Sequence, residues 1–100
     1  MSVKMIMTWD IAPNHEQEYF EFVVREFIPA VKHMGVDLSD AWATVYGDRP
    51  QILITAVAPS LSKARQLLRS AEWKEIQSRL LELVVNFNVK IVEARNSFQF

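Results

Sequence analysis

Residues 41–58 read AWATVYGDRPQILITAVA. Two runs rich in β-branched, aromatic and apolar residues flank Gly47-Asp48-Arg49-Pro50, a segment with the composition of a turn. The stretch therefore predicts a β-hairpin with a four-residue loop. A strand and a helix are expected before this hairpin, and a helix and a strand after it.

The chain before the hairpin predicts one strand and one helix. Residues 3–10 alternate between two sets of side chains, which is the period of a strand, and Ala12-Pro13 ends it. Asn14, followed three residues later by Gln17, resembles a helix N-cap. Apolar residues then recur at helical spacing until Gly35, which is placed to end the helix.

Pro29 interrupts this helical pattern. In a helix interior it removes one backbone hydrogen bond and collides with the carbonyl of Arg25, at a cost of about 3 kcal/mol. We expect a kink or a break there, with the chain helical on both sides. Such a bend either opens a pocket or only wraps the helix around the sheet.

After the hairpin, Pro59-Ser60 opens a second helical region and Ser70 offers another cap, so this region is one bent helix or two helices. Asn86-Phe87-Asn88 is expected to close it, before a last strand over residues 89–94. The order βαββαβ predicts a single ferredoxin-like α+β sandwich over residues 1–100, with an antiparallel sheet in the order 4-1-3-2.

The two faces of this sheet are expected to differ. One phase of the strands is almost purely apolar and should lie under the helices: Val3, Met5, Met7, Ala41, Ala43, Val45, Ile52, Ile54, Ala56, Val89 and Ile91. The other phase is mixed rather than polar: Ile6, Thr8, Asp10, Trp42, Thr44, Tyr46, Leu53, Thr55, Val57, Lys90 and Val92. A sheet face exposed to water would carry mainly polar residues at these alternate positions. We therefore predict that two sheets pack face to face in a homodimer.

The overall composition excludes several classes. The net charge of −1 comes from interspersed residues and argues against a nucleic-acid surface. An RNA-recognition module shares the βαββαβ order, but the expected third strand, Gln51 to Ala58, has no stacking aromatic residue. The absence of Cys excludes disulfides and thiolate metal sites, and the N-terminus is too weakly apolar for a signal peptide or membrane span. We expect a cytoplasmic protein.

Three features resemble a known superfamily. They are the opening strand that ends Trp9-Asp10 before Pro13, the Glu-rich helix start leading to Tyr19-Phe20, and the segment Leu67-Leu68-Arg69-Ser70-Ala71-Glu72-Trp73. The layout resembles the dimeric α+β-barrel superfamily, which includes antibiotic-biosynthesis monooxygenase-like, stress-responsive barrel and NIPSNAP-like proteins. The resemblance implies a barrel formed by two sheets around a pocket, with Phe98 and Phe100 reaching the partner.

Cofactors and metals are not expected. Some relatives in this superfamily bind haem through a His, but neither His15 nor His33 lies in a matching motif. Their separation also lacks the short spacing of a metal site.

Two candidate sites follow from the predicted fold. Polar residues should meet at the end of the sheet where the first helix starts: Asp10, His15, Tyr46, Asp48, Arg49, Asn86 and Asn88. At that end these residues could bind a small polar ligand or transfer a proton. The alternative is that they only cap helices and stabilise turns. Within the barrel, the ligand-binding candidates are Thr8, Trp42, Thr44, Tyr46 and Arg49. Trp42 and Tyr46 could instead simply fill the dimer interface.

The function predicted from these residues is a dimer that binds a small organic ligand between or beside the sheets. The alternative, which the resemblance implies, is a cofactor-independent monooxygenase or isomerase acting on an aromatic or polyketide-like compound. Its catalytic candidates are Asp10, His15 and Tyr46.

Overall fold

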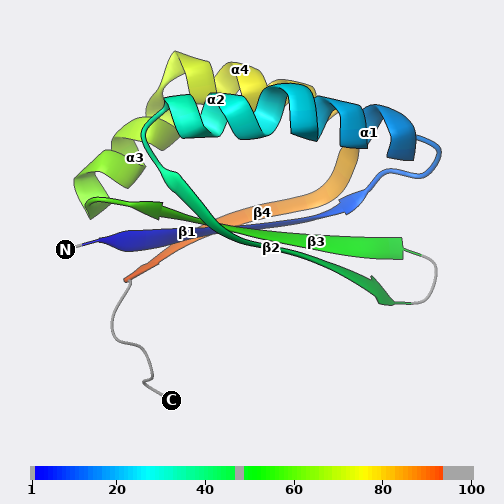
Figure 1. The fold of residues 1–100 in the computed structure, drawn as a ribbon, viewed down its shortest axis with the longest axis horizontal. Coiled ribbons are helices and arrows are strands. Elements are labelled where there is room, and N and C mark those ends of the chain that lie inside the picture. Colours follow the sequence, from blue (N-terminus) through cyan, green and yellow to red (C-terminus); the bar gives the residue numbers. More distant parts are fainter. Residues whose placement is uncertain (1, 47–48, 94–100) are drawn as a thin grey trace.

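The computed structural model describes residues 2–46 and 49–93, and only the backbone of residues 40, 42, 44–46 and 49–51. The expectations for Asp48, Phe98 and Phe100 lie outside the described residues. The elements follow the predicted order (Figure 1): β1 (Val3–Ile11), α1 (Glu16–Phe22), η1 (Val23–Phe27), α2 (Ile28–His33), β2 (Asp37–Tyr46), β3 (Arg49–Ala58), α3 (Leu61–Arg69), α4 (Ala71–Leu80) and β4 (Val84–Glu93).

The four strands form one antiparallel sheet in the order β2-β3-β1-β4, which is the predicted order read from the other edge. Figure 1 shows every helical segment on one side of this sheet. On the other side, no element of the described part of the chain covers the strands. We call that side the open face. The fold is therefore the ferredoxin-like α+β arrangement predicted from the sequence.

The hairpin between β2 and β3 is longer than predicted. Val45 pairs with Pro50 and Tyr46 pairs with Arg49, so Arg49 and Pro50 belong to β3 and the predicted four-residue loop is wrong. Pro50 is tolerated because it is only the second residue of its strand. The connecting residues 47–48 lie outside the described residues.

The core lies between the helices and the predicted apolar phase of the strands. Trp9, Phe27, Met5 and Met7 are among its largest fully buried side chains. Ala41 and Ala43 pair with Ile54 and Ile52 and so share the core side of the sheet, yet both are exposed. The expectation that they lie under the helices is wrong, because β2 is the edge strand and the helix layer does not cover it there.

The last strand begins earlier than predicted. Asn86-Phe87-Asn88 does not close the second helical region but lies inside β4. A β-bulge explains why the period was missed: Thr8 pairs with Asn88 and Asp10 with Val85, so two residues of β4 lie opposite Trp9 alone. Asn86 supplies the left-handed conformation of this bulge, with φ 57°. The bulge brings both Val84 and Phe87 to the core side.

The first helical region is not broken at Pro29, and the irregularity expected there takes the form of a π-helical segment. The five residues before α2 form the π-helical segment η1, in which the Ile28 N–H bonds to the Val23 carbonyl. This wider turn ends just before Pro29, which has no N–H to donate and occupies the first turn of α2. Asn14 is not the N-cap: it has φ 69° in the preceding turn, and His15 occupies the cap position without a side-chain bond.

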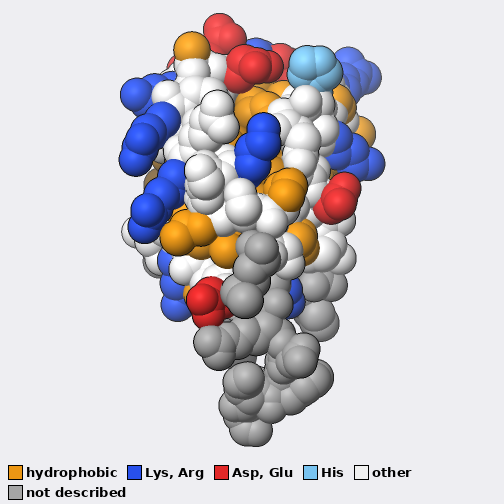
Figure 2. All heavy atoms as spheres, turned by 90° about the vertical axis from the view of Figure 1, so that its left-hand side faces the viewer, with side chains coloured by type: hydrophobic (Ala, Val, Ile, Leu, Met, Phe, Trp, Pro, Cys, Tyr) orange, Lys and Arg blue, Asp and Glu red, His pale blue; other side chains and the backbone are white. Residues whose placement is uncertain are grey.

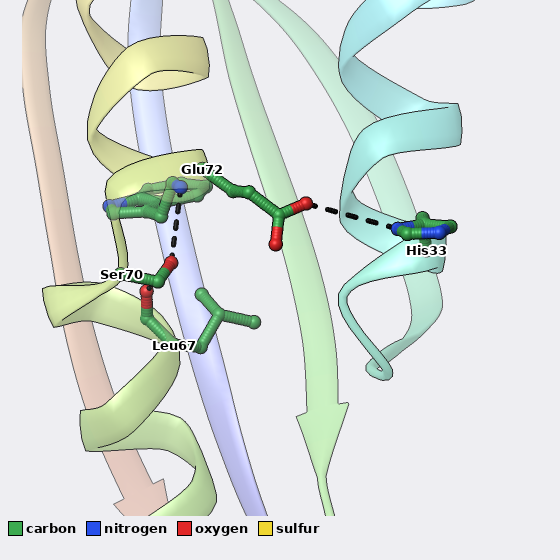
Figure 3. Close-up of polar contacts among 5 residues, drawn as sticks. His33, Leu67, Ser70 and Glu72 are labelled. Atoms are coloured by element: carbon green, nitrogen blue, oxygen red, sulfur yellow. Dashed lines mark hydrogen bonds and ion pairs between the residues drawn. The ribbon is translucent and has the colours of Figure 1, made fainter.

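Two separate helices, α3 and α4, form the second helical region, and Ser70 joins them (Figure 3). Its hydroxyl donates to the Leu67 carbonyl at 2.7 Å, at the end of α3. The same oxygen accepts the Trp73 N–H at 3.1 Å, at the start of α4. One side chain therefore bonds a backbone group at both helix ends, and the Leu67 carbonyl also accepts the Ser70 backbone N–H at 3.0 Å.

Replacing Ser70 with Ala should lower the free energy of unfolding by about 1 kcal/mol, because both helix ends lose a partner. Urea denaturation measures this loss. Ser78→Ala is the matched control, since Ser78 is exposed and only donates to the Glu75 carbonyl of its own helix. An equal loss in the two variants would show that Ser70 does not act as a joint between the helices.

Candidate functional site

Apolar side chains lie along the whole length of the open face, with Lys4 and Lys90 among them. Strand pairing places Ile6 opposite Thr55, and Lys4 opposite both Val57 and Val92, all on the side away from the helices. Ile6, Leu53 and Val57 are half-buried by their neighbours in the sheet, while Val85 and Val92 are each 36% exposed. The predicted mixed phase of the strands therefore forms one continuous face, as the sequence indicated.

Polar side chains gather at one end of this face. Thr8 pairs with Asn88, and Asp10 pairs with Val85 and Gln51. The Asn86 amide donates to the Asp10 carboxylate at 2.9 Å across the β-bulge. We call Thr8, Asp10, Asn86 and Asn88 the polar end. A carboxylate, two amides and a hydroxyl there present both hydrogen-bond donors and acceptors beside an apolar surface.

The remaining ligand-binding candidates lie on the hairpin at the same end of the sheet. Trp42 is the register partner of Leu53, Thr44 that of Gln51, and Tyr46 that of Arg49. Across the sheet, position 42 is therefore in line with Thr8 and position 44 with Asp10. Position 46 lies two residues further along β2. The register thus brings these backbone positions to the same end of the sheet as Asp10.

His15 is separated from the polar end by the sheet. It stands at the start of α1, in the helix layer, and its Nδ1 lies 3.2 Å from the Glu18 carboxylate on the same helix. His33 lies at the end of α2, with its Nδ1 3.9 Å from the Glu72 carboxylate (Figure 3). The predicted set of Asp10, His15 and Tyr46 is therefore divided between the helix layer and the sheet.

The buried pair of Trp9 and Tyr19 was not singled out as a polar contact by the sequence analysis. The Trp9 indole N–H donates to the Tyr19 hydroxyl at 2.8 Å, and Phe27 and Phe87 pack against the same indole ring. Burial raises the pKa of Tyr19, and the hydrogen bond from Trp9 opposes this in part. The pair anchors α1 to the end of β1, directly behind Asp10.

Tyr19→Phe should lower the free energy of unfolding by about 1–3 kcal/mol, because it leaves the buried Trp9 N–H without its acceptor. The pH dependence provides a second readout. The pKa of Tyr19 in the folded state lies above the ordinary value of 10.0. Its contribution to the free energy of unfolding is therefore complete below pH 10 and is lost as the pH rises above 10. Urea titrations across this range should show a steeper loss for the wild type than for Tyr19→Phe. Parallel curves would contradict the assignment.

The helix layer carries hollows that the sequence did not predict. One of them, about 890 Å³, lies along α3 and is lined by Leu61, Ser62, Arg65, Gln66, Arg69 and Ser70. Figure 2 faces the end of the molecule at which α3 lies and shows basic side chains interspersed with small apolar spots. A hollow next to it, formed by Val3, Leu61, Arg65 and the end of β4, has a volume of about 370 Å³. Neither contains a predicted site residue.

The described residues form neither a metal site nor a membrane-spanning helix. No group of three or more His, Asp or Glu side chains among residues 2–46 and 49–93 is arranged to hold a metal ion. In that same part of the chain, no helix has the length and apolar character needed to cross a membrane.

Comparison with known proteins supports the fold. No protein-family model matches the sequence, and no curated protein shows significant similarity. Among solved structures, a NIPSNAP family protein from Agrobacterium tumefaciens is 20% identical with a TM-score of 0.71, covering 97% of this chain and 89% of that one. A NIPSNAP-like domain protein from Burkholderia xenovorans gives the same identity and TM-score, over 97% and 88% of the two chains.

A third structure, from Chloroflexus aurantiacus, is described provisionally as an antibiotic biosynthesis monooxygenase. It is 12% identical with a TM-score of 0.65, covering 98% of this chain and 97% of that one. The predicted resemblance to this superfamily is thus confirmed at the level of the fold. The chain has the ferredoxin-like α+β fold found in NIPSNAP and monooxygenase-like proteins.

Proposed function

We propose that this chain forms a homodimer through the open face and binds a small organic ligand between the two sheets, at the polar end. The observation that carries the proposal is the open face itself. It combines apolar side chains on β1, β3 and β4 with the polar end, while Lys4, Lys90 and Asp37 lie toward the opposite end, and no element of the described chain covers it.

The apolar side chains of the open face support the dimer. Leu53, Val57, Val85 and Val92 lie on one face with Ile6, where a solvated antiparallel sheet would present polar side chains. Packing a second sheet against this surface removes apolar area from water, at roughly 25 cal/mol per Å². Sheets that pack in this way lie about 10 Å apart, with their inner side chains interdigitated.

The polar end supports the ligand site. Small-molecule pockets are mostly apolar, with a few polar groups that fix the orientation of the ligand. Thr8 and the Asp10–Asn86 pair supply such groups next to Leu53, and the pairing places Trp42 and Thr44 on the same rows of residues. An aromatic or other planar molecule with polar substituents fits this combination.

The dimer is tested by introducing a charge on the open face. Leu53→Asp should raise the dimer dissociation constant about tenfold or more, because a carboxylate from each copy enters the interface next to the uncharged Thr8. Light scattering over a dilution series measures the change. Val24→Asp is the matched control, since Val24 is 65% exposed on the helix side and should leave the mass unchanged. A wild-type chain that stays monomeric throughout would contradict the dimer.

The pocket is tested with the fluorescent probe 8-anilinonaphthalene-1-sulfonate. Thr8→Trp fills the space beside the polar end and should weaken probe binding at least tenfold, with the dimer retained by light scattering. Ser62→Trp places the same side chain in the α3 hollow and should leave binding unchanged. If Ser62→Trp weakened probe binding and Thr8→Trp did not, the binding site would lie at α3 and not on the sheet.

Catalysis on the bound compound is the second candidate function. It is favoured by the position of the Asp10 carboxylate at the polar end, where it is held by Asn86 and faces the proposed pocket. A carboxylate in this position has the geometry of a general base. Once a converted substrate is found, Asp10→Asn should lower its kcat far more than it raises its KM.

A further inference from the structure

The side of α3 that is exposed to water carries one apolar and two cationic side chains in a line. Leu61, Arg65 and Arg69 follow one another at intervals of four residues, so they lie along one side of the helix. All three are exposed, whereas Ala64 and Leu67 of the same helix are buried in the core. Figure 2 faces this end of the molecule and shows basic side chains beside small apolar areas. We call these three exposed residues the Leu–Arg row.

The two cations of the Leu–Arg row have no counter-charge in the described part of the chain. The sequence of α3 contains no acidic residue, and neither Arg65 nor Arg69 forms an ion pair with another described residue. On α4, by contrast, Arg79 is paired with Glu26 of η1. Like charges four residues apart on a helix repel each other. Anionic groups bound along the row would remove this repulsion.

Two hollows meet at the Leu–Arg row. The α3 hollow of about 890 Å³ contains both arginines and, among its described lining residues, no carboxylate. The hollow of about 370 Å³ at the end of β4 shares Leu61 and Arg65 with it. Val3 and Ile91 give this second hollow an apolar wall, and Glu93 is the one carboxylate in its described lining. One occupant can therefore place an apolar group in the second hollow and anionic groups in the first.

We propose that α3 is a docking surface for an acidic helical segment of a partner protein. Residues four apart in a helix are about 6 Å apart along its axis, so carboxylates one turn apart on a partner helix match the spacing of Arg65 and Arg69. One turn further along, a large apolar side chain reaches Leu61 and the hollow beside it. Guanidinium groups bind carboxylates through two parallel hydrogen bonds, and an apolar anchor in a pocket supplies affinity.

The size of the patch favours a protein segment over other anionic partners. Two arginines beside one apolar hollow form a small basic area, on a chain with a net charge of −1. Nucleic acids and anionic membranes are bound by larger clusters of basic residues. The docking surface goes beyond the proposed ligand site, because α3 belongs to the helix layer and not to the open face.

Fluorescence anisotropy tests the docking surface. The probe is a fluorescein-labelled, alanine-rich helical peptide with one leucine and, one and two turns further along, two glutamates. A second probe has the reverse order, because the row fits a partner helix in either direction. At least one probe should bind the wild-type protein. Combining Arg65→Glu with Arg69→Glu should weaken this binding about tenfold or more, because two attractive pairs become repulsive.

The matched control combines Lys32→Glu with Lys74→Glu, which changes the net charge equally at exposed positions of α2 and α4 that line neither hollow. Its binding should equal that of the wild type. A probe with lysine in place of glutamate should bind the variant with Glu at positions 65 and 69 and not the wild type, which also shows that this variant is folded.

Equal binding by the variant and its control, or no binding of either glutamate probe to the wild type, would overturn the inference. Binding of phosphatidylserine vesicles or of a single-stranded oligonucleotide, with no binding of the peptides, would overturn it in favour of another partner. The mass of the variant in light scattering should equal that of the wild type whatever the peptides do, so that the docking surface and the proposed dimer are tested separately.

Discussion

A four-stranded sheet has two faces, and the helices of this chain cover only one of them (Figure 1). The covered face is as apolar as a core requires, with Met5, Met7 and Trp9 almost completely buried. The second face also carries apolar side chains along its length, although nothing in the described chain packs on it. A surface of this kind often marks an interface, because covering it removes apolar area from water. The proposed dimer and its pocket both depend on this argument.

One backbone irregularity links the core to the polar end. The β-bulge at Asn86 changes which residues of β4 point to the core. Phe87 therefore stacks on Trp9 on the core side, with 5.8 Å between the ring centroids. The Asn86 side chain binds Asp10 at the same place. Behind Asp10, the hydrogen bond from Trp9 to Tyr19 fixes the start of α1. The polar end is therefore held in place by packed and hydrogen-bonded neighbours.

The strong periodic patterns predicted most of the fold. Alternation in residues 3–10 and 41–58 gave the strands, the order of elements gave the sheet, and Ser60 and Ser70 were recognised as caps. Local features that break a period were missed. The bulge made residues 84–88 resemble the end of a helix, and the π-helical turn before Pro29 has no sequence pattern that distinguishes it from a kink.

The candidate site was predicted less completely. The sequence indicated that Asp10, Asn86 and Asn88 meet at one end of the sheet, because strand order fixes which ends are adjacent. It did not separate His15 from them, because the side of the sheet on which a helix starts depends on the turn at Asn14. The hydrogen bond between Trp9 and Tyr19 was also missed, since two aromatic residues in a core give no sign of polar contact.

Hydroxyl-radical footprinting of the wild-type protein tests the central claim most directly, because it measures how far water reaches each side chain. If a second copy covers the open face, Leu53, Val57 and Val92 should be modified as slowly as the buried Ile54, while Phe20 and Val24 on the helix side react fast. Modification of Val92 at the rate of Val24 would show an open face in contact with water and would contradict the account.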